Sequence, residues 1–498
     1  TDPDGFTSSY EYDDRGNITR IVDPAGGVTT ATYDDRGNRL SQTNAEGETS
    51  LFAYDGRDNL LSITTPIGAT THFGYDSRDL LTSRTDPLGR VTRYQYDSAS
   101  RPIAVIDALG NTSRAHTRDQ DGNLVATVVD ARGARSERQL NANGHMFAET
   151  DPRGGVTTLS LDARGIPNEV VAPAGNTMSY EFNGLGQLVR VSDELGNAVV
   201  RTVDATGRVI RAENPDGTAS EMRHDGRGNR TAVIDRSGRE TRYEYDSRGR
   251  RITSETDPNG NVTSYEYDAA GRNTAMVDAL GNRTEFTYDL VGNLISRLDA
   301  RGNRTDYVYD VLDRLIRTEY PDGSTETIDY DPLGNIIAET DRLGRTKSYT
   351  YDPNDNLSSV TDIDGAVTTY SYDENNNRIR QTDANGHSTR MVYDGNDRLL
   401  EKQYPDGSTE RFEYDAGGRV ARTVLPDGKY IDASYDGFGR PTGHNLNGEG
   451  TESFTYDGAG RLTQAVNLWG TVDYRYDADG RVIEITSEGG HAVRYGYD

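Results

Sequence analysis

The sequence predicts an all-β protein, a continuous antiparallel meander of hairpins coiled into a spiral, hollow β-shell. Three observations predict this fold class. A Tyr-Asp pair recurs about every 21 residues, turns with Asp and Gly recur about every ten, and large apolar side chains are scarce. Only 33 % of the 498 residues are hydrophobic and the mean hydropathy is -0.80. Such a chain is too polar to fill a solid core of this size.

The Tyr-Asp pair marks one repeat unit, and the tyrosines are predicted to form a structural ladder. Between Tyr96 and Tyr245 the period continues without its tyrosines, so residues 118–244 are predicted to be degenerate repeats. We expect residues 1–498 to form a single array of about 24 units of 21 residues. The ladder positions singled out are Tyr12, Tyr33, Tyr96, Tyr245, Tyr267, Tyr309, Tyr351, Tyr372, Tyr414 and Tyr456.

Each unit contains two turns of the same chemistry. The first has the pattern Asp-x-x-Gly, and the second has Asp-Pro-x-Gly. This pattern is typical of a type I turn followed by a residue with positive φ, which is the geometry of a hairpin with a G1 bulge. The structural turn residues of one unit are Asp246 and Gly249 in the first turn and Asp257, Pro258 and Gly260 in the second.

Substitutions at the first-turn glycine support this interpretation. Asp and Asn are the non-glycine residues that best tolerate positive φ, and they replace the glycine in all but one of the exceptional units. These positions are Asp58, Asp79, Asp313, Asp355, Asn376 and Asp397, with Ser100 as the exception.

The segments between the turns alternate with period two and are rich in Thr and Tyr, as in Thr263 to Tyr267. This alternation predicts strands. Pairs of tyrosines and aliphatic residues on neighbouring strands would each contribute roughly 0.2–1 kcal/mol. Tyrosine suits a half-wet face because its hydroxyl can stay bonded to water. A ribbon of about 48 such strands is expected to coil, because sheets twist.

Charge and composition exclude several classes of function. The net charge is -27, with 54 Lys+Arg against 81 Asp+Glu. That balance disfavours nucleic acid and anionic membranes as partners. The chain has no Cys, which excludes disulfides and thiolate metal sites, and no apolar stretch long enough to span a membrane. We expect any export signal to lie outside this chain.

Candidate chemical sites are few. The stretches Asp119 to Gly122, Asp362 to Gly365 and Asp477 to Gly480 begin like calcium loops, but turn chemistry accounts for them. No metal, cofactor or catalytic residue is therefore assigned, and an aspartate dyad formed across the sheet stays open as an alternative. The histidines lack metal or triad spacing; they are His72, His116, His145, His224, His387, His444 and His491.

Two motifs resemble those of the YD-repeat (Rhs-repeat) family. One is Tyr-Asp-Gly-Ala-Gly-Arg-Leu at Tyr456 to Leu462, and the other extends from Asp257 to Asp268. The resemblance covers the whole chain. It implies a hollow β-shell around a C-terminal toxin, as in bacterial Rhs polymorphic toxins and the B/C subunits of Tc-type insecticidal toxins. Teneurins and wall-associated bacterial proteins use similar shells at cell surfaces.

The resemblance implies a non-enzymatic shell segment, secreted or at the cell surface. Its expected partners are an encapsulated toxin or other polypeptide cargo, a flanking N-terminal plug and secretion machinery. The autoproteolysis motif of Rhs-type shells is missing: Asp331 to Gly334 begins similarly, but no Gly-Gly-x-Asn run follows. We expect the chain to be the repeat part of a longer protein. The alternative is a cell-surface adhesion or carbohydrate-binding module with the same fold.

Overall fold

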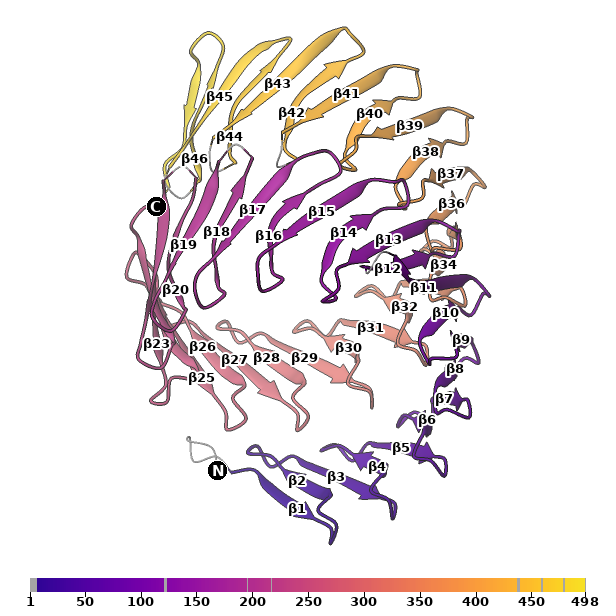
Figure 1. Cartoon of the computed structure of the whole chain (residues 1–498). Coiled ribbons are helices and arrows are strands. Elements are labelled where there is room, and N and C mark those ends of the chain that lie inside the picture. Colours follow the sequence, from indigo (N-terminus) through magenta and orange to yellow (C-terminus); the bar gives the residue numbers. More distant parts are fainter. Residues whose placement is uncertain are drawn as a thin grey trace. The chain divides into compact units, whose positions relative to one another are not determined.

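The computed structural model describes residues 7–120, 123–194, 196–215, 217–436, 439–457, 460–477 and 480–497. Within these ranges the chain forms 47 β-strands and no helix. Figure 1 shows the hairpins following one another along the chain. The strands belong to one sheet and pair antiparallel with their neighbours in the sequence. The predicted all-β antiparallel meander is confirmed. Because the described residues lack helices, they also contain no helical segment that could cross a membrane.

The strands are short, mostly five or six residues. The first part of the chain contains β1 (Ser9–Tyr12), β2 (Ile18–Val22), β3 (Val28–Tyr33), β4 (Arg39–Thr43), β5 (Thr49–Tyr54), β6 (Leu60–Thr64), β7 (Thr70–Tyr75), β8 (Leu81–Thr85), β9 (Val91–Tyr96), β10 (Pro102–Ile106) and β11 (Thr112–Gln120). The degenerate stretch contains β12 (Asn123–Val129), β13 (Arg135–Leu140), β14 (Met146–Thr150), β15 (Val156–Leu161), β16 (Pro167–Val171), β17 (Thr177–Phe182), β18 (Leu188–Asp193), β19 (Ala198–Val203), β20 (Val209–Glu213), β21 (Ala219–His224), β22 (Arg230–Ile234) and β23 (Glu240–Tyr245).

The second half continues with the same period. It contains β24 (Ile252–Thr256), β25 (Val262–Tyr267), β26 (Asn273–Val277), β27 (Arg283–Tyr288), β28 (Leu294–Leu298), β29 (Arg304–Tyr309), β30 (Leu315–Glu319), β31 (Thr325–Tyr330), β32 (Ile336–Thr340), β33 (Thr346–Tyr351), β34 (Leu357–Thr361), β35 (Val367–Tyr372), β36 (Arg378–Thr382), β37 (Ser388–Tyr393), β38 (Leu399–Gln403), β39 (Thr409–Tyr414), β40 (Val420–Val424), β41 (Tyr430–Tyr435), β42 (Pro441–Leu446), β43 (Gly450–Tyr456), β44 (Leu462–Asn467), β45 (Gly470–Tyr476), β46 (Val482–Ser487) and β47 (Ala492–Arg494).

Contacts group the chain into two compact units. The first takes in residues up to Arg114, Tyr243–Tyr372 and Thr382–Gly386. The second takes in Ala115–Arg242, Asp373–Gln381 and residues from His387 onward. Each unit therefore combines hairpins from an early stretch of the chain with hairpins from a late stretch, and each is described by itself.

The turns are closed by backbone hydrogen bonds and contain residues with positive φ. In the first turn of one unit, the Gly249 N–H donates to the Asp246 carbonyl at 2.8 Å. In the second, the Gly260 N–H donates to the Asp257 carbonyl at 3.0 Å, and Pro258 lies between them. The φ angles of the two glycines are 70° and 86°. The seven residues that replace a first-turn glycine have φ between 59° and 70°.

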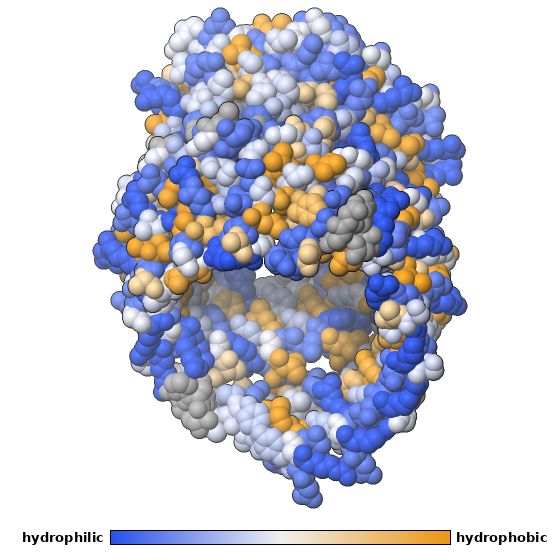
Figure 2. All heavy atoms as spheres, in the orientation of Figure 1, coloured by the Kyte–Doolittle hydropathy of each residue, from blue (hydrophilic) through white to orange (hydrophobic). Residues whose placement is uncertain are grey.

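The sheet buries very few apolar side chains. Among the described residues the buried hydrophobic ones are Ala104, Val125, Ala148, Ala232, Ala275 and Met391, four of them alanine. Figure 2 shows mostly polar residues on the visible face, with apolar ones scattered between them. Stability therefore has to come from the strand ladder and from side-chain contacts between successive hairpins.

Candidate functional site

Tyrosine hydroxyls tie each hairpin to the preceding one. The Tyr33 hydroxyl donates to the Ile18 carbonyl at 2.9 Å, across 15 residues. The same bond, at 2.7–3.0 Å and the same spacing, is made by Tyr267, Tyr288, Tyr309, Tyr330, Tyr351, Tyr372, Tyr393, Tyr414, Tyr435, Tyr456 and Tyr497. The expectation that these hydroxyls stay bonded to water is wrong, because a backbone carbonyl of the preceding hairpin lies within reach.

The other three predicted ladder tyrosines also lie at the ends of strands. Tyr12 ends β1 and is 59 % exposed. Tyr96 ends β9, and Tyr245 ends β23 at the equivalent place of its repeat. Burial raises the pKa of ladder tyrosines such as Tyr309 and Tyr414. The ladder rings are therefore covered by their own neighbouring hairpins.

Arginine residues complete the link between hairpins. Arg272 lies five residues after Tyr267, and its guanidinium carbon is 5.0 Å from the ring centroid of Tyr288. Arg272 Nε donates to Asp268 Oδ2 at 2.7 Å, and Nη1 donates to the Asp289 carbonyl at 2.6 Å. A stacked arginine of this kind combines cation–π attraction with charge-assisted hydrogen bonds to two separate acceptors. Burial alone would raise the pKa of Asp268, but the bonds from Arg272 lower it.

The same position can hold asparagine, which is followed 20 residues later by glycine in some units, such as Asn17 before Gly37, and by aspartate in others. Five such asparagines donate from Nδ2, at 2.7–2.9 Å, to an aspartate with positive φ 20 residues later. The pairs are Asn38–Asp58, Asn59–Asp79, Asn293–Asp313, Asn335–Asp355 and Asn377–Asp397. Where the position is arginine, glycine follows in the next turn. The φ of Gly271 is 87°, in the left-handed region that favours glycine.

The aspartates that begin the second turns predict how the stability of the protein depends on pH. Hydrogen bonds from an asparagine amide, 2.8–2.9 Å long, lower the pKa of Asp257, Asp278 and Asp299 below the usual 3.8. A lowered folded-state pKa stabilises the protein above the unfolded-state pKa, and that contribution is lost as pH falls through the folded-state value. We expect Tm to be constant from pH 7 to about pH 5 and to fall between about pH 4 and pH 2. Thermal unfolding followed by circular dichroism checks this, and a constant Tm down to pH 2 would contradict it.

Turns that are far apart in the sequence meet within each unit, and we call this contact the seam. In the first unit, Asn354 Nδ2 donates to Asp107 Oδ2 at 2.6 Å. Arg90 donates to the Asp352 carbonyl at 3.0 Å and to Asp355 Oδ1 at 2.7 Å. The residues from the early part of the chain belong to second turns, and those from the late part belong to first turns.

The seam of the second unit repeats this pattern. Asn375 donates to Asp130 at 2.5 Å and Asn396 to Asp151 at 3.0 Å. The early turns connect β12 to β13 and β14 to β15, and the late turns connect β35 to β36 and β37 to β38. The paired residues are 245 apart in both cases, which is about twelve repeats. The chain therefore returns to its own edge after about twelve hairpins.

Arg132 is the most heavily used residue of this seam. Its guanidinium donates to the Asp394 carbonyl at 2.8 Å and pairs with Asp373 at 3.4 Å and with Asp397. Its side chain is 18 % exposed and that of Asp373 is 10 % exposed. These charges are mostly shielded from water, so each depends on the others for compensation.

The sequence carries a signal for the seam that the sequence analysis missed. The predicted repeat pattern assigns no residue type to the third residue after the repeat tyrosine. At early first turns it is arginine, and Arg36 and Arg57 reach sideways to the next turn of the same edge. At the late turns of the seam it is asparagine, in Asn354, Asn375 and Asn396. First turns already dock on second turns before this point, where the Leu290 N–H donates to Glu46 at 3.0 Å and the third position is Val291, so asparagine marks only part of the seam.

Of the calcium-like stretches, Asp362 to Gly365 forms a turn, whereas Asp119 and Gln120 belong to the end of β11. Asp362 Oδ1 accepts the Ile363 N–H at 2.9 Å, and Asp364 Oδ1 accepts the Ala366 N–H at 3.1 Å. Asp121 and Asp479, in the other two stretches, lie outside the described residues. The described part of the chain contains no group of three metal-ligating side chains.

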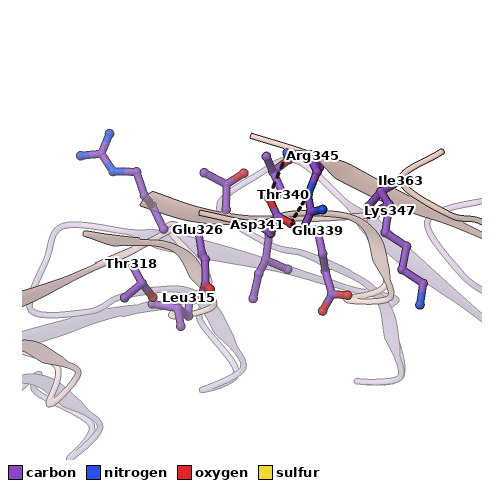
Figure 3. A pocket seen from close by; sticks show the side chains of 12 residues that line it. Leu315, Thr318, Glu326, Glu339, Thr340, Asp341, Arg345, Lys347 and Ile363 are labelled. Atoms are coloured by element: carbon purple, nitrogen blue, oxygen red, sulfur yellow. Dashed lines mark hydrogen bonds and ion pairs between the residues drawn. The ribbon is translucent and has the colours of Figure 1, made fainter. Parts of the chain in front are cut away.

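A cavity of about 360 Å³ lies over β30 to β33 in the first unit (Figure 3). The Tyr349 hydroxyl donates to Glu339 at 2.5 Å, and burial together with this bond raises the pKa of Tyr349 to about 12. Asp341 pairs with Arg345 at 2.6 Å. The acidic groups at this cavity are thus engaged in bonds within the wall.

The repeat can now be compared with known proteins. The family model for the RHS Repeat matches overlapping segments across residues 1–112 and 203–325, and the model for the Teneurin YD-shell matches residues 324–498. The chain belongs to the YD-repeat (RHS-repeat) family. The YD-repeat chain has no match among the curated proteins.

Solved structures show the same YD-repeat fold at low sequence identity. The Photorhabdus luminescens Tc holotoxin pore aligns with 96 % of this chain and 29 % of its own, at 16 % identity and a TM-score of 0.58. The TcdB2-TccC3-Cdc42 crystal structure aligns with 97 % and 29 %, at 16 % identity and a TM-score of 0.54. TcdB2-TccC3-TEV aligns with 96 % and 32 %, at 15 % identity and a TM-score of 0.53. The YD-repeat chain spans about a third or less of these proteins.

Proposed function

We propose that this chain is a wall segment of a YD-repeat shell that encloses and shields a polypeptide cargo, a toxin in the first instance. The seam carries the proposal. Hairpins about twelve repeats apart join edge to edge through side chains, such as Asn375 on Asp130. A sheet that closes on itself in this way, with few buried apolar residues, suits a wall around a space better than a solid domain.

The wall would act by keeping the cargo apart from its surroundings, without catalysing a reaction. Its tyrosines are bonded to neighbouring carbonyls and its turn aspartates to backbone N–H groups, so its polar side chains serve the wall itself. The Tc toxin structures of similar fold support a toxin as the cargo. We further propose that residues 1–498 form one array, that the chain is not an enzyme, and that it is secreted or displayed at the cell surface beside a plug and secretion machinery.

Limited proteolysis tests the enclosure. The protein is produced from its natural reading frame, digested under native conditions, and the surviving peptides are identified by mass spectrometry. We expect polypeptide outside the YD repeats to survive in the wild type and to be cut in a variant whose seam is weakened, Asn375→Ala with Asn396→Ala. Arg57→Ala, at an early first turn outside the seam contacts described above, serves as the matched control and should protect as the wild type does. Equal cleavage of the enclosed part in all three proteins would contradict the proposal.

A further inference from the structure

The degenerate repeats leave an open place in the tyrosine ladder of the second unit. Two successive ladder positions are occupied by Val203 and His224 instead of tyrosine. A cavity of about 600 Å³ lies there, over β19 to β21. Its lining consists of Thr202, Asp204, Arg208, Ile210, Arg211, Glu221, Met222, Arg223 and His224.

We call each ladder position, together with the side chains around it, a rung: an intact rung has tyrosine at the ladder position, and the rung of His224 is called the open rung. An intact rung shows which side chains normally occupy the volume of this cavity. The equivalent cavity in the first unit, beside Tyr309, measures about 280 Å³. Tyr307 and Tyr309 stand there where Met222 and His224 stand in the larger cavity. The smaller cavity is also bordered by Glu46 from the early part of the chain. Two phenol rings are therefore replaced by a thioether and an imidazole at the open rung.

The groups that serve a tyrosine elsewhere are present at the open rung. Arg208 donates to Asp204 Oδ2 at 2.7 Å and to the Asp225 carbonyl at 3.2 Å, the same two bonds that hold the stacking arginines of intact rungs. The residue that follows it on the ladder is His224. His224 has no hydroxyl to offer the Val209 carbonyl, the equivalent of the Leu294 carbonyl that accepts the Tyr309 hydroxyl.

His224 itself adds an unused polar atom. Its Nδ1 is buried and has no hydrogen-bond partner. A buried polar atom without a partner destabilises the protein, so a ligand that forms a hydrogen bond with it binds more tightly for that reason. A hydroxyl can both donate and accept, and therefore suits a place that offers a carbonyl and an imidazole nitrogen.

The charged residues around the cavity indicate a neutral ligand. Arg211 pairs with Glu221 at 3.0 Å and with Glu213 at 3.1 Å. Arg223 pairs with Glu240 at 2.9 Å. Each arginine already has a carboxylate partner, so an anion would have to compete with existing ion pairs. A flat aromatic ring needs only the guanidinium face of Arg208, which intact rungs use for stacking.

We propose that this cavity binds a 4-hydroxyphenyl group, the side chain of tyrosine or a free 4-alkylphenol. The ring lies beside His224 against the guanidinium of Arg208, and its hydroxyl bonds to His224 Nδ1 and the Val209 carbonyl. The repeat itself supplies the template, because the units of Tyr288 and Tyr330 hold a phenol ring against an arginine at the same repeat position as Arg208. The site does not depend on the shell enclosing a cargo.

Histidine-selective NMR of the 498-residue chain tests this site. The chain has seven histidines, so ¹³Cε1-labelled histidine gives few signals, and the His224 signal is the one lost in His224→Tyr. We expect p-cresol to change the chemical shift of His224 in a saturable way. Toluene lacks the hydroxyl and should bind at least about tenfold more weakly, since one hydrogen bond to a buried group contributes about 1.4 kcal/mol. No movement at millimolar p-cresol, or equal movement with toluene, would overturn the proposal.

Matched variants and peptides sharpen the test. Because p-cresol binds the folded protein, we also expect it to raise the Tm of the wild type. His224→Tyr places a phenol ring in the cavity and should abolish this rise in Tm. If His224→Tyr folds poorly, His224→Asn serves to identify the NMR signal of His224. Tyr330→His should create a second p-cresol-sensitive histidine, because Arg314 stacks on Tyr330 at 4.7 Å. An unstructured peptide with one tyrosine is compared with its phenylalanine version. If the tyrosine peptide changes the chemical shift of His224, the site binds protein side chains. If only p-cresol changes it, the site binds free phenols.

Discussion

Replacing Tyr414 with alanine should lower the free energy of unfolding of the surrounding repeats by about 3 kcal/mol, the low end of aromatic-to-alanine changes, because the ring is only half-buried. The substitution removes the hydroxyl bond to the Leu399 carbonyl, 2.7 Å long, and the ring under the Arg398 guanidinium, 4.6 Å from its centroid. Both contacts join one hairpin to the preceding one. Urea unfolding followed by circular dichroism measures the loss.

Two controls separate the ring from the hydroxyl and from the residue type. Tyr414→Phe keeps the ring and should cost about 1 kcal/mol, the value of one hydrogen bond. Tyr12→Ala removes a tyrosine of the same repeat position that is 59 % exposed, and should cost less than about 0.5 kcal/mol. Equal losses for Tyr414→Ala and Tyr12→Ala would show that the ladder does not bind hairpins together.

Replacing Arg132 with alanine should open the seam of the second unit and lower the free energy of unfolding of the repeats at that seam by about 3 kcal/mol. The change leaves Asp373, 10 % exposed, near Asp397 without the cation that pairs with both. Removing one partner of a poorly hydrated ion pair is costly because the remaining charge stays desolvated. Hydrogen exchange at the turns near residues 373 and 394 measures the opening, and we expect it to speed up there.

Arg57 supplies the matched control for this prediction. It also pairs with an aspartate in a neighbouring turn, Asp79 at 3.0 Å, but its side chain is 48 % exposed. An exposed ion pair contributes about 0–1 kcal/mol, so Arg57→Ala should change stability by less than 1 kcal/mol. If Arg132→Ala leaves exchange at the seam unchanged, the contacts between distant turns are not what holds the two edges together.

Local features of the fold could be predicted from the sequence because they depend on neighbouring residues. A type I turn with a bulge needs Asp at its start and a residue of positive φ at its end, and the exceptions at Asp58 and Asn376 obey the same rule as the glycines. Strand identity follows from period-two alternation with Thr and Tyr. These requirements act over fewer than ten residues, so a single repeat reveals them.

Contacts beyond one repeat could not be predicted in the same way. Whether the Tyr33 hydroxyl finds water or the Ile18 carbonyl depends on how far one hairpin leans over the preceding one. Which turns meet at the seam depends on how many hairpins complete a coil, and small changes in twist per strand alter that number. The change from arginine to asparagine after the repeat tyrosine becomes interpretable only when Asn354 is found against Asp107.

The central claim is that distant hairpins close edge to edge at the seam, and one cross-linking measurement tests it most directly. The chain has no Cys, so Asp107→Cys with Asn354→Cys introduces a single reactive pair, where the native side chains are 2.6 Å apart. A short bismaleimide should link these two residues intramolecularly in high yield. It should not link Asp107→Cys with Leu312→Cys, which occupies the same repeat position two repeats before Asn354 in the same unit. Absence of the first cross-link, or equal yields from both pairs, would contradict the account.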